Sequence, residues 1–183
     1  MARLPIITPE KATGKAHELL TAVQKKLGLI PNMTRVMVNS PAVLEAYIGF
    51  SGALDGGSLD AKTRERIALE VAEANQCDYC LSAHSTIGKL VGLNEAEILD
   101  SRRARSTDSK SAAALQFSRQ VVEKAGAVGE ADVEAARKGG LTDGELAEVV
   151  ALTVLNIFTN YFNTAFKVDI DFPVVKALTV AAR

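Results

Sequence analysis

The stretch Cys77-Asp78-Tyr79-Cys80-Leu81-Ser82-Ala83-His84 contains both cysteines of the chain and one of its two histidines. If this segment is helical, Cys77, Cys80 and His84 lie on one face, because residues three and four positions apart are neighbours on a helix. A base one helical turn from a thiol favours the thiolate, which is the nucleophilic form of cysteine. The spacing therefore predicts redox chemistry carried by one helix face.

Helical patterns extend outward from this segment in both directions. Upstream, a helix is expected from residues 58–60 toward Asn75, and Asn75 with Asp78 has the capping-box spacing that would begin the cysteine helix. Downstream, the same spacing predicts helix starts at Asn94 and at Thr142.

The N-terminal third also has helical patterns. Thr8 followed by Pro9 is typical of a helix start, and Gly28 of its end. A second helix is expected from Pro41 to the glycines at 56–57. No segment shows the alternation of a strand. The sequence therefore predicts an all-α fold, organised as a single helical domain over residues 1–183.

A faint internal repeat relates residues 60–92, which include the thiol motif, to residues 142–168. At this offset Cys77, Cys80 and His84 align with Asn160, Asn163 and Lys167, respectively. A degenerate duplication that has lost the thiols would give this pattern. A shared amphipathic periodicity would give it as well.

The two cysteines can divide the work of a peroxide-reducing dithiol, in which one thiolate attacks and the second thiol resolves the sulfenic acid to a disulfide. The helix dipole favours Cys77 as the attacking residue, whereas His84 favours Cys80. A hydrogen-bonding base usually outweighs a dipole contribution of about 0.3–1 kcal/mol. We therefore assign the attack to Cys80 and the resolution to Cys77.

Glu65 is the candidate for orienting His84 or recharging it with protons. It lies on an apolar stripe of the preceding helix, where a carboxylate needs a partner. Glu70 and Glu73 are its rivals, and both are expected on the surface.

Other interpretations of these residues remain open. Cys77, Cys80 and His84 offer three zinc ligands, with a carboxylate, a water or the distant His17 as the fourth. The cysteines could also simply fill the core. Tyr79 points off the cysteine face, so it either packs or takes part in a proton relay.

Composition excludes several classes of function. The 183 residues are 48% hydrophobic and 23% charged with a net charge of −1, which gives no reason to expect a nucleic-acid partner. No apolar run of the length of a membrane span is evident, and no signal peptide, so we expect no membrane association and a cytoplasmic protein. No cofactor or resident metal is predicted.

The segment from Arg64-Glu65-Arg66 to Cys77-Asp78-Tyr79-Cys80 and His84 resembles the carboxymuconolactone decarboxylase family, in particular its alkylhydroperoxidase D-like, peroxidase-related branch. The shared pattern is Glu, eleven residues, Cys-x-x-Cys, three residues and His. The segments at 28–33 and 163–173 are similar to that branch as well.

This resemblance implies an all-helical fold assembled into trimers, hexamers or related homo-oligomers. It implies that Cys80 attacks peroxide, that Cys77 resolves, and that Glu65 and His84 relay protons. Some members place a relay histidine between the cysteines, where this chain has Tyr79, so the role of Tyr79 stays open. A lipoylated protein returns the electrons in the best-known members.

The leading hypothesis is therefore a thiol-dependent peroxidase that reduces hydrogen peroxide or organic hydroperoxides through a Cys77–Cys80 disulfide. The alternatives are a redox-responsive or zinc-binding module without turnover, and lactone chemistry of the decarboxylase type. Decarboxylases of the wider family lack the cysteine pair, which argues against the lactone chemistry. A surplus of apolar helix surface predicts a homo-oligomer.

Overall fold

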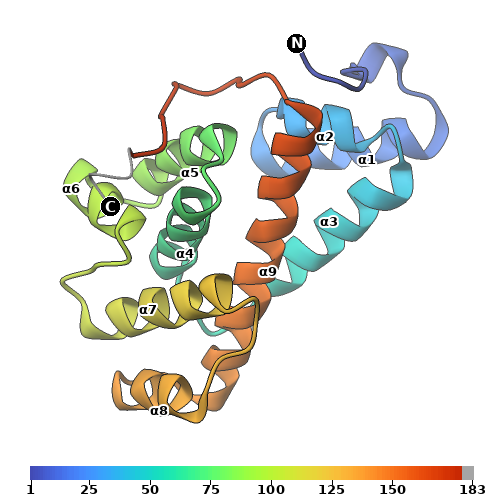
Figure 1. Ribbon diagram of the computed structural model, residues 1–183. Helices are drawn as coiled ribbons and strands as arrows, with labels where there is room; N and C mark the ends of the chain where they lie inside the picture. Colours follow the sequence, from blue (N-terminus) through green and yellow to red (C-terminus); the bar gives the residue numbers. More distant parts are fainter. Residues whose placement is uncertain (179–183) are drawn as a thin grey trace.

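A computed structural model describes residues 1–178 as a bundle of helices without a strand, which confirms the all-α prediction (Figure 1). The elements in chain order are the 3-10 helix η1 (Pro9–Lys11) and the α-helices α1 (Gly14–Leu27), α2 (Asn32–Met37), α3 (Pro41–Asp55), α4 (Ala61–Ala74), α5 (Asp78–Leu90), α6 (Glu95–Arg102), α7 (Ser109–Glu123), α8 (Glu130–Lys138) and α9 (Asp143–Phe166).

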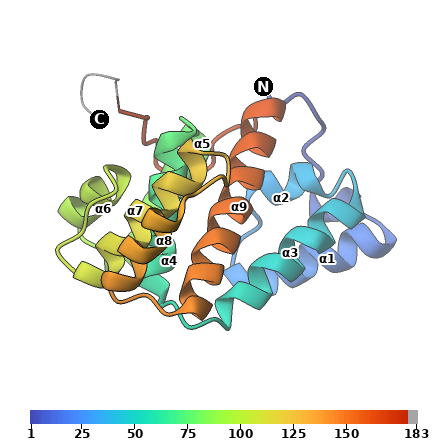
Figure 2. The same cartoon turned by 60° about the horizontal axis from the view of Figure 1, so that its bottom comes forward.

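Helix α4 is the centre of the arrangement, because it packs against α5, α6, α7 and α9. Helices α1 to α3 lie on one side of α9 and helices α6 to α8 on the other, as both orientations show (Figures 1 and 2). Two main hydrophobic clusters follow from this division. One joins α1, α2, α3 and α5, and the other joins α4, α7, α8 and α9. The start of α5, with the cysteines, belongs to the first cluster.

Most of the expected helix ends are confirmed. Gly28 ends α1 in the left-handed conformation, with φ of 74°. Capping boxes begin α6 at Asn94 and α9 at Thr142. Thr8, in contrast, begins only the short η1, and α1 starts at Gly14, because the chain is extended again at Ala12 and Thr13.

The expected cap of the cysteine helix at Asn75 is wrong. Asn75 ends α4, Gln76 turns the chain with a positive φ of 53°, and Cys77 is the residue that caps α5. The Cys77 backbone N–H still donates to Ala72 O at 2.9 Å, so α4 and α5 are joined without a free linker. This tight turn shifts the helix start by two residues.

Helix α9 is, in the described part of the chain, the one helix long and apolar enough to cross a membrane by length and composition. Only 44% of its apolar window is buried inside the structure. Buried polar residues nevertheless interrupt its apolar face, among them Asn156, Asn160 and Asn163. Its contacts with α3, α4, α5, α7 and α8 are those of a core helix.

The two segments of the suggested repeat differ in form. Residues 60–92 contain α4, a sharp turn and α5, whereas residues 142–168 are almost entirely the continuous α9. A duplication therefore stays a prediction about ancestry. The two segments meet in space, because α9 packs against both α4 and α5.

After α9 the chain runs back over α5, and we call residues 168–178 the C-terminal strap (Figure 1). The strap is held mainly by side chains of α4 and α5. Asp78 accepts hydrogen bonds from Ala177 N and Lys176 Nζ, both at 2.9 Å, and Ser82 Oγ accepts one from Val175 N at 2.9 Å. The strap thus covers the start of the cysteine helix.

Candidate active site

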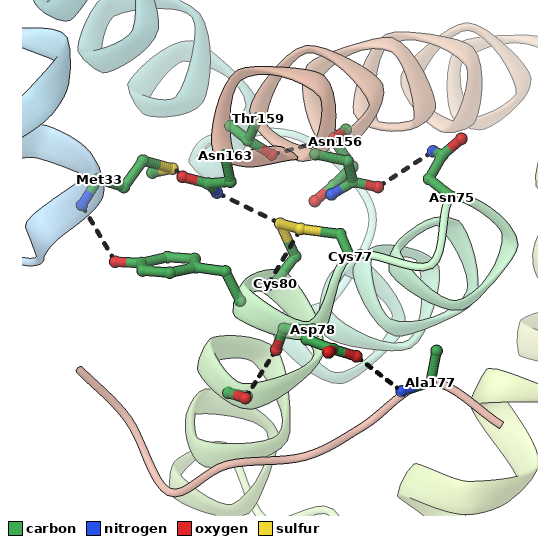
Figure 3. Close-up of a disulfide and its surroundings, with 12 residues drawn as sticks. Met33, Asn75, Cys77, Asp78, Cys80, Asn156, Thr159, Asn163 and Ala177 are labelled. Carbon is green, nitrogen blue, oxygen red and sulfur yellow. Dashed lines mark hydrogen bonds between the residues drawn. A yellow bond between two sulfur atoms is a disulfide. The ribbon is translucent and has the colours of Figure 1, made fainter. Parts of the chain in front are cut away.

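A disulfide joins Cys77 and Cys80 at the start of α5, with their Cα atoms 5.3 Å apart (Figure 3). Each cysteine is only 2% exposed. Cys77 stands at the helix cap, and its Sγ accepts a hydrogen bond from Cys80 N at 3.3 Å. Cys80 therefore lies in the first helical turn, where the helix dipole favours a negative charge. The structure shows the oxidised form of the predicted pair.

A cavity of about 280 Å³ opens beside this disulfide, between α1, α3, α4, α5 and α9. Cys80 is one of its lining residues, and Cys77 is not. A small molecule that enters can therefore reach the sulfur of Cys80 first. Much of the wall is apolar, formed by Leu27, Pro31, Met33, Leu54, Ala68, Ala83, Ile87, Leu152, Leu155 and Phe172.

His84 and Glu65 form the polar pair of the cavity wall. His84 Nδ1 lies 2.8 Å from Glu65 Oε2, and the two side chains are 21% and 17% exposed. A carboxylate can only accept, so Nδ1 carries the proton of this bond when Glu65 is ionised. Nε2 is then the nitrogen free to exchange a proton within the cavity. The structure thus brings Cys80, His84 and Glu65 to one cavity, as the spacing predicted.

Asn163 of α9 completes the surroundings of the sulfur. Its Nδ2 donates to Cys80 Sγ at 3.3 Å and to Met33 Sδ at 3.3 Å (Figure 3). Asn163 was not among the site residues expected from the sequence, although the repeat alignment pairs it with Cys80.

Tyr79 lines the same cavity, but its hydroxyl contacts Asp171 and Met33 and neither His84 nor Glu65. The hydroxyl donates to Asp171 Oδ1 at 2.9 Å and accepts from Met33 N at 3.1 Å. Burial raises the pKa of Tyr79 far above its ordinary value, against the lowering effect of the Met33 N–H. These two hydrogen bonds connect α5 to α2 and to the C-terminal strap, which is a structural role.

Glu70 and Glu73, expected on the surface, are fully buried, so that expectation is wrong. Glu70 is 0% exposed and accepts from Arg119 Nε at 3.0 Å, while Glu73 is 1% exposed and accepts from Arg102 Nε at 2.8 Å. Burial raises the pKa of Glu70 above its ordinary range, and Arg119 opposes this effect. Neither carboxylate lines the cavity. Glu65 therefore remains the one that faces His84.

Several cavity residues carry no signal in a local motif. Tyr47 comes from α3, and Asn156 and Thr159 from α9. Burial, and then the charge of Glu65, raise the pKa of Tyr47 to about 12, so its hydroxyl stays protonated. The polar residues of α9 share a face with Asn163, because they precede it by seven and four positions. The feature of the sequence that could have indicated these residues is the row of polar side chains on one face of an otherwise apolar helix.

The geometry gives no support to the zinc-binding alternative. Within residues 1–178, no three side chains of His, Cys, Asp or Glu gather closely enough to hold a metal ion. His17 is exposed on α1, where its Nδ1 lies 3.2 Å from Pro9 O.

Comparison with known proteins agrees with this geometry. The model of the carboxymuconolactone decarboxylase family matches residues 41–124, which include Glu65, both cysteines and His84. An uncharacterised protein of Haemophilus influenzae (strain ATCC 51907 / DSM 11121 / KW20 / Rd) is 50% identical over 46 residues, which are 25% of this chain. The match spans 41% of that relative's length.

Solved structures resemble nearly the whole chain. The alkylhydroperoxidase AhpD core of an uncharacterised peroxidase-related protein from Ralstonia eutropha JMP134 is 25% identical with a TM-score of 0.80, over 93% of this chain and 92% of that one. An uncharacterised peroxidase-related protein from Silicibacter sp. TM1040 is 23% identical with a TM-score of 0.79, over 91% and 88% of the two chains.

A third structure shows that the fold supports other reactions. The debrominase Bmp8, solved in complex with 2,3,4-tribromopyrrole, has a TM-score of 0.74 at 17% identity, over 93% of this chain and 94% of that one. At this identity the likeness concerns the fold alone. The family match over residues 41–124, the cysteine pair and the shared fold thus make the chain similar to the carboxymuconolactone decarboxylase family and to its alkylhydroperoxidase D-like, peroxidase-related proteins.

Proposed function

We propose that the protein is a thiol-dependent peroxidase that reduces hydrogen peroxide or organic hydroperoxides through a Cys77–Cys80 dithiol/disulfide cycle. The observation that carries this proposal is the asymmetry of the disulfide. Cys80 lines a cavity together with the His84–Glu65 pair, and Cys77 lies behind it. A disulfide with one sulfur on a substrate cavity suits a cycle of attack and resolution.

In the proposed cycle, His84 takes the proton of the Cys80 thiol, and the Glu65 carboxylate stabilises the imidazolium that forms. The thiolate attacks the terminal oxygen of the hydroperoxide. The S–O bond forms, the O–O bond breaks, and the departing alkoxide takes the proton from His84 and leaves as the alcohol. Cys80 is now a sulfenic acid.

Cys77 then resolves this intermediate. Its sulfur attacks Cys80 Sγ, the S–O bond breaks, and the oxygen leaves as water after taking up the Cys77 proton. Sulfur has been oxidised by two electrons and the peroxide reduced by two. A dithiol reductant, such as a lipoyl group on a partner protein, returns the two electrons through a mixed disulfide.

We also propose that the protein acts as a homo-oligomer in the cytoplasm, as a trimer or hexamer. Large apolar side chains are exposed along one face of α9, at Val150, Val154, Phe158 and Tyr161. They recur at intervals of three and four residues, so they form one stripe. Contiguous apolar surface of this kind marks an interaction site.

Peroxide consumption with dithiothreitol or dihydrolipoamide as the reductant tests the peroxidase proposal. We expect Cys80→Ser to abolish turnover and Cys77→Ser to abolish the disulfide while keeping the first oxidation step. Wild-type turnover in Cys80→Ser would overturn the proposal. Activity on a lactone that survives the double cysteine variant would favour the decarboxylase-type chemistry instead.

A further inference from the structure

We infer that Asn163 is a catalytic residue whose amide clamps the reacting atoms, with its N–H on the Cys80 sulfur and its carbonyl oxygen on the O–H of the hydroperoxide. The N–H contact is a property of the site itself, and the role of the carbonyl oxygen rests on the proposed peroxidase function.

The orientation of the Asn163 amide follows from its two sulfur neighbours. Nδ2 lies 3.3 Å from both Cys80 Sγ and Met33 Sδ. A disulfide sulfur and a thioether carry no hydrogen and can only accept. The nitrogen must therefore face them, and Oδ1 is the remaining polar atom of the amide. Figure 3 shows the side chain of Asn163 reaching from α9 toward Cys80.

Oδ1 of Asn163 is a buried acceptor without a hydrogen-bond partner among the described residues. The residue as a whole is only 3% exposed, and it lines the cavity next to Cys80. Buried polar atoms are nearly always hydrogen-bonded in native proteins, so one left unpaired at a reactive sulfur calls for a ligand that donates. A hydroperoxide brings one O–H group, located on the oxygen that the thiolate attacks.

The end of helix α9 fixes the main chain at Asn163. Asn163 lies in the last turn of α9, where the chain leaves the helix. The main-chain carbonyl oxygen of Asn163 accepts a hydrogen bond from Val168 N at 3.1 Å. Lys167 ends the helix with a positive φ of 47°. The contacts of Nδ2 with the two sulfurs hold the side chain before substrate binds, which is what a preorganised donor requires.

The amide makes and breaks no covalent bond in this step. When Cys80 is reduced, Nδ2–H donates to the thiolate, and this charge-assisted bond is stronger than the one to the disulfide. Oδ1 accepts the hydroperoxide O–H and directs its oxygen toward Sγ. As the S–O bond forms and the O–O bond breaks, the hydrogen stays on that oxygen, so Oδ1 next accepts from the sulfenic acid. The alkoxide still takes its proton from His84.

The first test measures the thiol without any peroxide. In a Cys77→Ser background, where Cys80 is the single thiol, its alkylation rate is measured against pH. We expect Asn163→Ala to slow alkylation near neutral pH about tenfold and to move the whole profile to higher pH, because the thiolate loses a donor.

Asn160→Ala is the matched control. Asn160 is a fully buried amide one turn earlier on α9, it bonds to Asn75 at 3.0 Å, and it does not line the cavity. We expect its variant to keep the alkylation profile of the background. Equal profiles for the Asn163 and Asn160 variants would overturn the N–H contact.

A second measurement does not depend on the Asn163→Ala variant, in case that variant does not fold. In the folded Cys77→Ser protein, one asparagine side-chain amide resonance should move with the same pH midpoint as Cys80 alkylation. The nearly isosteric Asn163→Asp should abolish this signal and slow alkylation further, since a carboxylate beside the thiolate repels it. No titrating amide resonance would contradict the inference.

Turnover then tests the carbonyl oxygen separately. With the proposed function correct, Asn163→Ala should raise KM for the hydroperoxide as well as lower kcat, whereas a loss confined to kcat would contradict the role of Oδ1. If the wild type consumes no peroxide, the proposed function fails, while the alkylation profiles still decide the N–H contact.

Discussion

The Glu65–His84 pair gives the sharpest quantitative prediction for the chemistry. Its 2.8 Å hydrogen bond is charge-assisted by the Glu65 carboxylate and becomes stronger when His84 takes the Cys80 proton. A hydrogen bond to a charged group contributes about 1.5–3 kcal/mol, and a neutral one about 0.5–1.5 kcal/mol. Both side chains are about one-fifth exposed, so solvent screens the pair and the lower part of each range applies.

Two substitutions separate the charge of Glu65 from its hydrogen bond. Glu65→Gln keeps a neutral acceptor and loses about 1–1.4 kcal/mol, which is about a 5- to 10-fold lower kcat/KM for peroxide. Glu65→Ala loses the whole bond, about 1.5–2.2 kcal/mol, which corresponds to about a 10- to 40-fold decrease. We expect kcat/KM to decrease from the wild type to Glu65→Gln and further to Glu65→Ala.

The assay is peroxide consumption under excess dithiol, with thermal unfolding measured in parallel. Glu95→Gln is the control, because Glu95 is exposed and pairs with Lys89 on the same helix as His84. We expect this variant to match the wild type. If Glu65→Ala also retained wild-type kcat/KM, the assignment of the proton relay to Glu65 and His84 would be refuted.

Three further predictions concern the residues around the site. Tyr79→Phe removes one buried and one partly buried hydrogen bond and should lower the free energy of unfolding by about 1–3 kcal/mol with peroxide turnover retained. A loss of turnover comparable to that of Glu65→Ala would instead indicate a proton-relay role. Burial opposes ionisation of Asp78, but Lys176 and the Ala177 N–H outweigh it and lower the pKa of Asp78 below its ordinary value of 3.8. The anchoring of the C-terminal strap by Asp78 is therefore present above pH 3.8 and lost as pH falls through the lowered pKa. Unfolding curves of wild type and Asp78→Asn should accordingly differ near neutral pH and converge in acid, and a difference that persists in acid would count against this anchor. Phe158→Lys on the exposed stripe of α9 should dissociate the proposed oligomer in analytical ultracentrifugation, and a monomeric wild type would rule the oligomer out.

Helix existence was predictable here because the signals are local. The capping boxes at Asn94 and Thr142 and the left-handed end at Gly28 each depend on residues within one turn. The missed elements lack such signals. Helix α2 has six residues, too few for a period, and α8 has nine, of which Ala136 is the one buried residue.

The closeness of Cys77, Cys80 and His84 was also predictable, because they lie at the cap and in the first two turns of one helix. The pairing of Glu65 with His84 was confirmed as geometry, since both lie on neighbouring helices joined by a tight turn. The cap at Asn75 was wrong because the pattern of a capping box does not include the turn at residue 76.

Contacts between distant segments could not be predicted in this way. Glu70 is buried against Arg119, which lies 49 positions away, and the Tyr79 hydroxyl meets Asp171 at a separation of 92. Asn163 reaches Cys80 across 83 positions. Such contacts depend on how the helices pack, so the pattern of residues within one helix does not predict them.

Trapping the first oxidised sulfur tests the central claim most directly. Reduced Cys77→Ser protein is mixed with one equivalent of hydroperoxide in the presence of a sulfenic-acid reagent, and the labelled peptide is identified by mass spectrometry. We expect a label on Cys80, and, in a parallel reaction of reduced wild type without the reagent, a loss of two hydrogens as the disulfide forms. A label absent from Cys80, or fast oxidation of Cys77 in the Cys80→Ser protein, would contradict the central claim.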